Sequence, residues 1–410
     1  MPISVADLKA LDEADELAPF RDEFVLPEGV IYLDGNSLGP LPRATPGRVA
    51  EVVEQEWGRG LIRSWNSAGW IGMAERVGEK IALLIGAPPG TVMAADTTSV
   101  NIFKLLSVAL GSRPGRRVIL SEAGNFPTDL YVAEGLVALL GAQHELRTVD
   151  TADIPSALGP DVAVLMLTHV NYRTGAMHDM AALTHAAHEA GALTLWDLAH
   201  SAGAVPVDVA AADADLAVGC GYKFLNGGPG APAFLHVARR LQAEARYPIT
   251  GWLGHADPFG FHPTYSPAPG IGRATVSTPS ILAMAVLEVG VDIALRAPMD
   301  AVRAKSLRQA AALMELVADQ CPELELATPM AERARGSQVS FRHPEGYAIM
   351  QALIARGIIG DFRTPDILRF GITPLTLRYA ELWEVAASLR EIVGAGRWRE
   401  ERFRVRQRVT

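Results

Sequence analysis

The chain contains little cysteine. Only Cys220 and Cys321 occur among its 410 residues. Two thiols cannot build a disulfide framework or supply the several ligands of a cysteine-based metal site. The sequence therefore predicts a protein of the reducing cytoplasm that is stabilised by its core and has no metal centre.

Long apolar runs and an excess of positive charge are also missing. The formal net charge is −9 at pH 7, whereas a nucleic-acid-binding protein needs a positive face for the phosphates. No apolar run approaches the ~18–20 residues that span a bilayer, and the acidic N-terminal stretch lacks the features of a signal peptide. We therefore expect neither nucleic acid nor membrane as a partner. The hydrophobic share of 49% excludes a disordered chain.

Lysine is scarce as well, because only five of the 37 basic residues are lysines. Lys9, Lys80, Lys104 and Lys305 are expected to be solvated, on helices or at their rims. Lys223 differs, because it lies in the apolar, glycine-rich stretch GCGYKFLNGGPG. A desolvated lysine amine can form a Schiff base and a guanidinium cannot. Lys223 is therefore either a catalytic amine or an ion-paired lysine, and composition alone leaves both open.

Between residues 92 and 237, short apolar segments alternate with helical patterns. Strands are expected at residues 92–95, 117–121, 145–149, 161–168, 193–196, 215–219 and 233–237. This alternation is typical of an α/β sheet with helices on both faces. We predict three parts: an N-terminal arm that packs with the small domain, a large α/β domain and a smaller α+β domain, over residues 1–45, 46–284 and 285–410.

The ends of three predicted strands carry residues suited to chemistry, and ligands of such sheets bind at the carboxyl ends of strands. Asp96-Thr97-Thr98-Ser99 precedes a helix and can be a phosphate-binding turn or an ordinary helix cap. Asp197 ends a second strand, with His200 just after it, and Lys223 follows a third. A lysine for an imine, a carboxylate for a pyridine nitrogen and a phosphate-binding turn together meet the needs of pyridoxal 5'-phosphate.

Two weaker patterns point to other chemistry. Gly35-Asn36-Ser37-Leu38-Gly39 matches the G-x-S-x-G turn of serine hydrolases, but Pro40 and Pro42 stand where the following helix should begin. His185 and His188 are spaced for one helix face, yet no acidic partner lies in register with them, so we expect exposed histidines and no metal site.

Five stretches carry a resemblance to a known family: YLDGNSLGP from Tyr32, NFPTD from Asn125, WDLAHSAGA from Trp196, GYKFLNGGPG from Gly221 and GWLGH from Gly251. The chain resembles the bacterial kynureninases, pyridoxal-phosphate enzymes with the aminotransferase fold (fold type I, class V), over nearly its whole length. The resemblance implies a large mixed-sheet α/β domain, a smaller α+β C-terminal domain, bound pyridoxal 5'-phosphate and a cytoplasmic homodimer with composite active sites.

The resemblance also implies a role for individual residues. Lys223 would bind the cofactor as a Schiff base, Asp197 would pair with the pyridine nitrogen beside His200, and Phe126 would stack on the ring. Thr97, Thr98 and the phenol of Tyr222 would hold the phosphate. Other positions matching cofactor contacts are Pro127, Thr128, Asp129 and Thr168, together with Trp252 and Thr278 from across a dimer interface.

Arg369, in LRFGITPL, matches the family's arginine for the substrate carboxylate. An arginine in a short buried strand needs an anion or several acceptors. The nearest acid in the sequence is Asp366, and pairing with a distant Glu or Asp is the structural alternative. Trp65 and Thr278 stand where several animal-type members have His and Asn, which favours kynurenine over its 3-hydroxy form.

The reaction that the resemblance implies is hydrolytic cleavage of L-kynurenine to anthranilate and L-alanine, a step of tryptophan catabolism and pyridine nucleotide biosynthesis. Tyr222 would relay protons to the ketone. The alternatives are another enzyme of the same fold, a cysteine desulfurase or an aminotransferase, and a non-catalytic cofactor-binding module. A desulfurase needs a reactive cysteine on a mobile loop, and Cys220 and Cys321 fit that need poorly.

Overall fold

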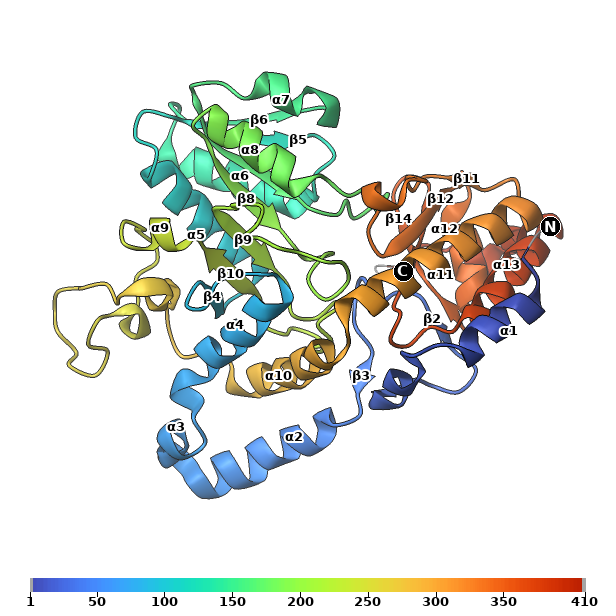
Figure 1. The fold of residues 1–410 in the computed structure, drawn as a ribbon, viewed down its shortest axis with the longest axis horizontal. Helices are drawn as coiled ribbons and strands as arrows, with labels where there is room; N and C mark the ends of the chain where they lie inside the picture. Colours follow the sequence, from blue (N-terminus) through green and yellow to red (C-terminus); the bar gives the residue numbers. More distant parts are fainter. Residues whose placement is uncertain (1–2, 408–410) are drawn as a thin grey trace.

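The computed structural model describes residues 3–407, which build two main β-sheets with their own helices and two further pairs of short strands (Figure 1). The larger sheet has seven strands in the order β4-β10-β9-β8-β7-β5-β6. Its strands are β4 (Val92–Ala94), β5 (Val118–Glu122), β6 (Glu145–Val149), β7 (Val162–Thr168), β8 (Leu193–Asp197), β9 (Leu216–Gly219) and β10 (Phe234–Val237). All seven strands expected from the sequence are therefore present.

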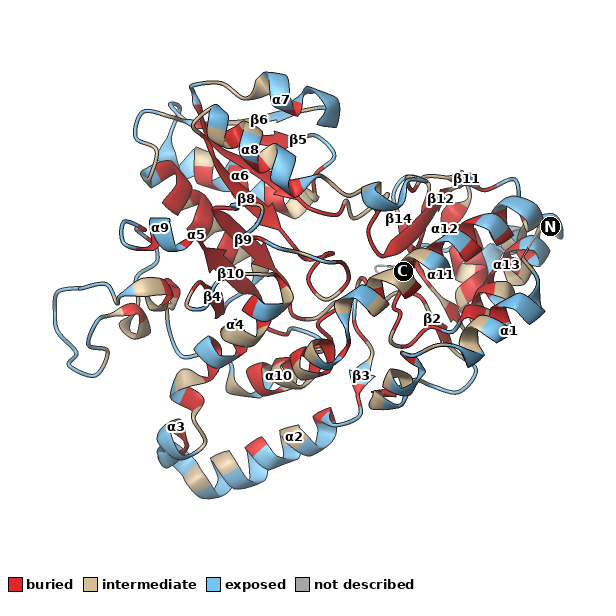
Figure 2. Ribbon diagram, viewed as in Figure 1, coloured by how far each residue is buried: buried red, intermediate tan, exposed pale blue. Residues whose placement is uncertain are grey.

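The larger sheet is mixed. Strands β5 to β9 pair in parallel, and β10 is antiparallel to both β9 and β4. Every residue of β7 is buried, as expected for a parallel strand covered on both faces. Figure 2 shows the buried strands covered by helices, some of which are exposed on their outer sides and some of which are themselves largely buried. These helices are α4 (Met73–Leu84), α5 (Thr98–Gly111), α6 (Pro127–Leu140), α8 (Met180–Glu189) and α10 (Ile281–Arg296).

The smaller sheet is antiparallel, in the order β11-β12-β15-β14. Its strands are β11 (Glu325–Leu326), β12 (Gln338–Arg342), β14 (Asp361–Arg363) and β15 (Ile367–Gly371). Helices α11 (Met299–Gln320), α12 (Gly346–Ile354) and α13 (Tyr379–Gly394) enclose a second apolar core with it.

The N-terminal segment packs on this second core. Leu8 of α1 (Val5–Glu13) is fully buried there, and the Asp12 carboxylate accepts the N–H groups of Tyr379 and Ala380 at the start of α13. β2 (Ile31–Tyr32) then pairs in parallel with β13 (Ile358–Ile359), and β1 (Phe24–Val25) pairs with β3 (Leu41–Pro42). The predicted domain boundaries stay predictions; α10 runs across the one at residue 284.

A helical arm extends from the main body (Figure 1). It begins with α2 (Thr45–Glu51), continues as a π-helix (Val52–Gly60) and ends near α3 (Ser64–Ser67). The arm leaves large apolar side chains exposed, including Trp57, Leu61 and Ile62. The remaining short helices are α7 (Ile154–Ala157), α9 (Arg239–Gln242) and α14 (Glu401–Arg404).

Two of the lysine predictions were wrong. Lys104 and Lys305 are buried and not solvated. Lys104 donates to the Asp96 carboxylate at 2.8 Å and to the Ala274 carbonyl, and Lys305 donates to Asp15 at 2.6 Å and to the Pro374 carbonyl. Helical periodicity could not reveal these acceptors, because three of them lie on segments distant in sequence and Asp96 lies in the turn before α5.

His188 also differs from its expectation. Its Nε2 lies 2.7 Å from the Asp215 carboxylate, so it does have an acidic partner, which precedes β9. Within residues 3–407 no cluster of His, Cys, Asp and Glu could hold a metal ion. None of the helices in the described part of the chain is long and apolar enough to cross a bilayer.

Candidate active site

The turn between β4 and α5 has features that suit an anion. Thr97 is the N-cap of α5, and its hydroxyl accepts the N–H of Val100 at 3.3 Å. The other N–H groups of the first helical turn have no partner within the helix, which favours an anion there. Asp96 adopts a left-handed conformation (φ 52°) and is paired with the buried Lys104. Lys104 therefore anchors this turn from behind, and Thr97 and Thr98 face outward.

Two buried carboxyl groups lie beside this edge of the sheet. Asp197 ends β8 and accepts the N–H of Ala199 at 2.7 Å, and Asp129 lies in the first turn of α6. Burial raises the pKa of both groups, and in Asp129 the charge of Asp197 raises the pKa further. The Thr168 hydroxyl, at the end of β7, is 3.3 Å from Asp129. Such a pair favours a cationic partner, because two neighbouring carboxyl groups cannot both ionise unless a positive charge lies beside them.

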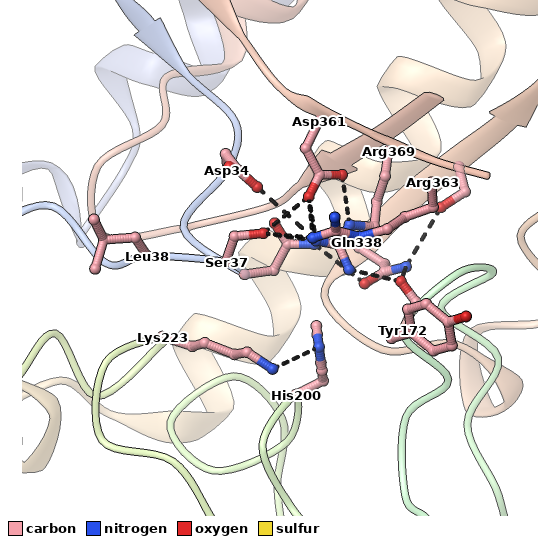
Figure 3. Close-up of polar contacts among 12 residues, drawn as sticks. Asp34, Ser37, Leu38, Tyr172, His200, Lys223, Gln338, Asp361, Arg363 and Arg369 are labelled. Atoms are coloured by element: carbon pink, nitrogen blue, oxygen red, sulfur yellow. Dashed lines mark hydrogen bonds and ion pairs between the residues drawn. The ribbon is translucent and has the colours of Figure 1, made fainter. Parts of the chain in front are cut away.

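Lys223 faces these groups. Its Nζ is 2.9 Å from Nε2 of His200 and 5.9 Å from the ring centroids of Phe126 and Tyr222. Burial, together with the nearby Lys223 charge, holds the pKa of His200 well below its usual value, so this imidazole is neutral. A neutral ring can accept a hydrogen bond from the lysine ammonium and hold it in place (Figure 3).

The G-x-S-x-G turn packs directly against the lysine segment. The N–H of Gly39 donates to the Tyr222 carbonyl at 2.8 Å, and a Cβ at Gly39 would lie 2.4 Å from the Lys223 carbonyl oxygen. Only glycine fits this approach. Ser37 contacts Asp361, Arg363 and Arg369, and no histidine of the described chain is among its hydrogen-bond partners. The turn therefore lacks the base of a serine hydrolase.

Arg369 is fully buried on β15 and has an acidic partner. Its Nε donates to Oδ1 of Asp361 at 2.8 Å, and its Nη2 pairs with Oδ2 of the same carboxylate. The structure therefore shows the structural alternative, an ion pair with an acid other than Asp366, which is the nearest one in the sequence. Asp366 lies in the turn before β15 and pairs with Arg342 at 3.4 Å. Asp361 lies opposite Arg369 on β14, so the cross-strand register and not the sequence distance decided the pairing.

The sequence analysis missed several residues around Arg369. These are Asp34, Tyr172, Asp361 and Arg363; Ser37 was noticed only as part of a discounted pattern. Burial and the neighbouring Asp361 charge raise the pKa of Asp34 to about 7. Asp34 and Ser37 lie in the YLDGNSLGP stretch, which could have identified them, whereas no sequence signal marked Asp361 or Arg363.

Three predicted site residues are not brought to Lys223 by any described contact. Trp65 packs edge-on against Trp70, on the arm that Figure 1 shows extending from the body. Trp252 packs against Phe259 and Phe261, and Thr278 is exposed. Their assignment to the active site stays a prediction that requires a second subunit.

Known proteins are similar in sequence to this chain over almost its full length. The family model "Kynureninase C-terminal domain" matches residues 302–389. A Burkholderia pseudomallei (strain 1106a) protein named "Kynureninase" is 53% identical over 408 residues, which is 98% of each chain. A Pseudomonas fluorescens protein of the same name is 52% identical over 411 residues, covering 98% of this chain and 99% of that one. The chain belongs to the kynureninase family.

Solved structures agree with this placement at the level of the fold. A cysteine desulfurase from Thermococcus onnurineus NA1 superposes with a TM-score of 0.78 at 19% identity, over 92% of this chain and 98% of that one. A C-DES variant with glycine linked to its pyridoxal-phosphate cofactor gives a TM-score of 0.80 at 19% identity, over 90% and 99%. The predicted fold class, α/β of fold type I, is confirmed.

Pyridoxal 5'-phosphate is the cofactor of the kynureninase family, and the residues present fit it. The buried pair of Asp129 and Asp197 favours a cation, which a protonated pyridine nitrogen would supply. The N-terminus of α5 at Thr97 and Thr98 favours a dianionic phosphate. Lys223, whose Nζ is 5.9 Å from the ring centroids of Phe126 and Tyr222, would supply the amine that binds the cofactor's aldehyde.

Proposed function

We propose that this protein hydrolyses the Cβ–Cγ bond of L-kynurenine and releases anthranilate and L-alanine. The observation that carries this proposal is the 53% identity to a kynureninase over nearly the entire chain. The polar groups of the site support it, since Lys223, Asp197 and Arg369 come from separate elements and surround one region. The reaction belongs to tryptophan catabolism and supplies pyridine nucleotide biosynthesis.

We assign the cofactor contacts by position. Lys223 would provide the amine for covalent attachment, Asp197 would keep the pyridine nitrogen protonated, and Phe126 would stack on the ring. Bound in this way, pyridoxal phosphate supplies an electron sink for carbanions at the substrate. The remaining assignments are Thr97, Thr98 and Tyr222 for the phosphate, and Pro127, Thr128, Asp129, Thr168 and His200 around the ring.

Proton transfer falls to Lys223 and Tyr222. As a free amine, Lys223 would remove the proton from the substrate Cα. His200 accepts a hydrogen bond from the same Nζ and limits its movement. Tyr222 is half-buried beside Lys223, and burial raises the pKa of its phenol, so it stays protonated and can donate to the γ-ketone when water adds. Arg369 holds the α-carboxylate.

The purified holoenzyme is expected to convert L-kynurenine to equal amounts of anthranilate and L-alanine without any added keto acid. Product analysis by chromatography and mass spectrometry measures this directly. Turnover that appears only with a keto acid would identify an aminotransferase, and sulfide released from cysteine would identify a desulfurase. Either result would replace the proposed activity.

We also propose a homodimer in which each active site uses residues of both subunits. An apolar groove of about 390 Å³ runs beside the lysine loop, between the Leu38–Pro42 segment and α10. Large side chains on the arm and on the loop after Trp252 are exposed, including Trp57, Ile62 and Phe261. Apolar surface of this extent is characteristic of an interface. A second subunit would bring Trp252, Thr278 and Trp65 to a partner's site, where Trp65 and Thr278 favour L-kynurenine over 3-hydroxykynurenine.

Mixing two inactive variants tests the composite site. Lys223→Ala and Trp252→Ala subunits are each expected to be nearly inactive as homodimers. A mixed dimer has one of its two sites with both residues intact, and random exchange of equal amounts makes half of the dimers mixed. Activity should therefore recover to about a quarter of the wild-type value per site. The same mixture with exchange blocked by cross-linking is the control. No recovery in mixtures with proven exchange would contradict shared sites.

Two buried, unpaired cysteines agree with the cytoplasmic location that we propose.

A further inference from the structure

The guanidinium of Arg369 is held along one of its two hydrogen-bonding edges. Asp361 on β14 lies opposite Arg369 on β15 in the antiparallel ladder. Its Oδ1 accepts from Nε at 2.8 Å, and its Oδ2 pairs with Nη2. Both residues are about 1% exposed. This two-bond arrangement fixes the plane of the guanidinium as well as its position.

The other edge, formed by Nη1 and Nη2, donates its hydrogen bonds to neutral acceptors, and Oδ1 of Asp34 lies 4.0 Å from Nη2. Nη1 donates to the carbonyl of Tyr172 at 2.7 Å, and Nη2 donates to the hydroxyl of Ser37 at 2.7 Å. Hydrogen bonds from a guanidinium to a carboxylate are stronger than those to neutral oxygens, so an anionic ligand can displace these two. Figure 3 shows Ser37 at one side of the Arg369 cluster and Tyr172 at the other, with the Lys223–His200 pair below the cluster.

The charges around Arg369 leave room for one more anion. Asp361 is shared with Arg363, whose Nη2 lies 2.6 Å from Oδ2, so a single carboxylate faces two guanidinium groups. Although burial alone would raise its pKa, the Arg369 charge lowers the pKa of Asp361, which is therefore ionised. The second acid, Asp34, has a pKa raised to about 7 and carries only part of a charge near neutral pH. The cluster is positive overall and suits a monoanion.

We propose that Asp361 is a positioning residue, which binds the Nε–Nη2 edge of Arg369 and thereby presents the Nη1–Nη2 edge to the α-carboxylate of the substrate. This inference rests on the proposed function, in which Arg369 receives that carboxylate. If the ion pair were merely structural, a different result would be expected. Its loss would then affect ligands with and without a carboxylate equally.

The test compares two ligands that differ only by the carboxylate. L-Alanine and ethylamine are titrated into the Asp361→Asn holoenzyme, and binding is followed by the visible absorbance of the cofactor. We expect the Kd of L-alanine to rise at least ~10-fold and that of ethylamine to stay within ~2-fold of wild type, because a charge-assisted contact is lost for one ligand only. KM for L-kynurenine should rise similarly, with a smaller change in kcat.

Two further variants complete the experiment. Asp361→Glu restores the carboxylate and should recover part of the L-alanine affinity. Asp366→Asn removes a neighbouring acid that pairs with Arg342 and not with Arg369, and should leave the Kd values of both ligands unchanged. If Asp361→Asn gives no folded holoenzyme, Asp361→Glu decides by the same ratio. Equal losses for both ligands, or an unchanged ratio of the two Kd values, overturn the proposal.

The alanine and ethylamine titrations do not require that kynurenine be the substrate. A wild-type protein that fails to cleave kynurenine but prefers L-alanine in an Asp361-dependent way would refute the proposed reaction and keep this inference. If the wild-type protein cleaves kynurenine but its preference for L-alanine over ethylamine does not depend on Asp361, the proposed reaction stands and this inference is refuted.

Discussion

The Lys223→Arg protein is expected to be colourless and to lose at least ~10⁴-fold in kcat, because a guanidinium can neither form the Schiff base nor remove the Cα proton. Arginine keeps the positive charge near Asp129 and Asp197, so the fold should survive. Borohydride reduction of the wild-type holoenzyme, followed by peptide mass spectrometry, should place the cofactor on Lys223. Absorbance and turnover of the two proteins give the comparison.

Lys80→Arg is the matched control for this experiment. Lys80 forms ion pairs with Glu288 and Asp292 on α10, and arginine can form the same pairs. Its absorbance and activity should equal those of the wild type. Full turnover by a Lys223→Arg protein that lacks bound cofactor would show that another group performs the chemistry.

The Arg369→Lys protein should keep the cofactor absorbance and lose at least ~100-fold in kcat/KM for L-kynurenine, about 3 kcal/mol of transition-state binding. Lysine can still pair with Asp361, but it cannot bind one carboxylate along one edge and a second along the other. A bound carboxylate also orients the Cα–H bond, so both kcat and KM should suffer. Steady-state kinetics with the holoenzyme measure the change.

Arg342→Lys serves as the control, since Arg342 lies on the adjacent strand β12 and pairs with Asp366 instead. The kcat/KM of this variant should fall less than ~3-fold, because the ion pair that it changes is partly exposed. An Arg369→Lys enzyme with intact cofactor and near-normal kcat/KM would show that the carboxylate is held elsewhere, with Arg363 as the nearest second guanidinium.

The local order of the large sheet was readable from the sequence by itself. Apolar strands and the turns at their ends have short-range signals, so the positions of Asp197, Thr97 and the strand before Lys223 were predicted closely. The scarcity of lysine singled out Lys223, because a chain that otherwise prefers arginine retains an amine there. Motif resemblance then supplied the family, which the 53% identity to a known member bears out.

Tertiary structure decided the partners of buried charges. The burial of Lys104 depends on Asp96 and Ala274, and that of Lys305 on Asp15 and Pro374. Arg369 receives Asp361 because β14 and β15 pair in one antiparallel register, and Ser37 arrives from a turn held against the Lys223 loop. A buried charge needs a counter-charge or several acceptors, and this need can be predicted from the sequence. Which group meets it depends on strand register and loop packing, and these exist only in the folded chain.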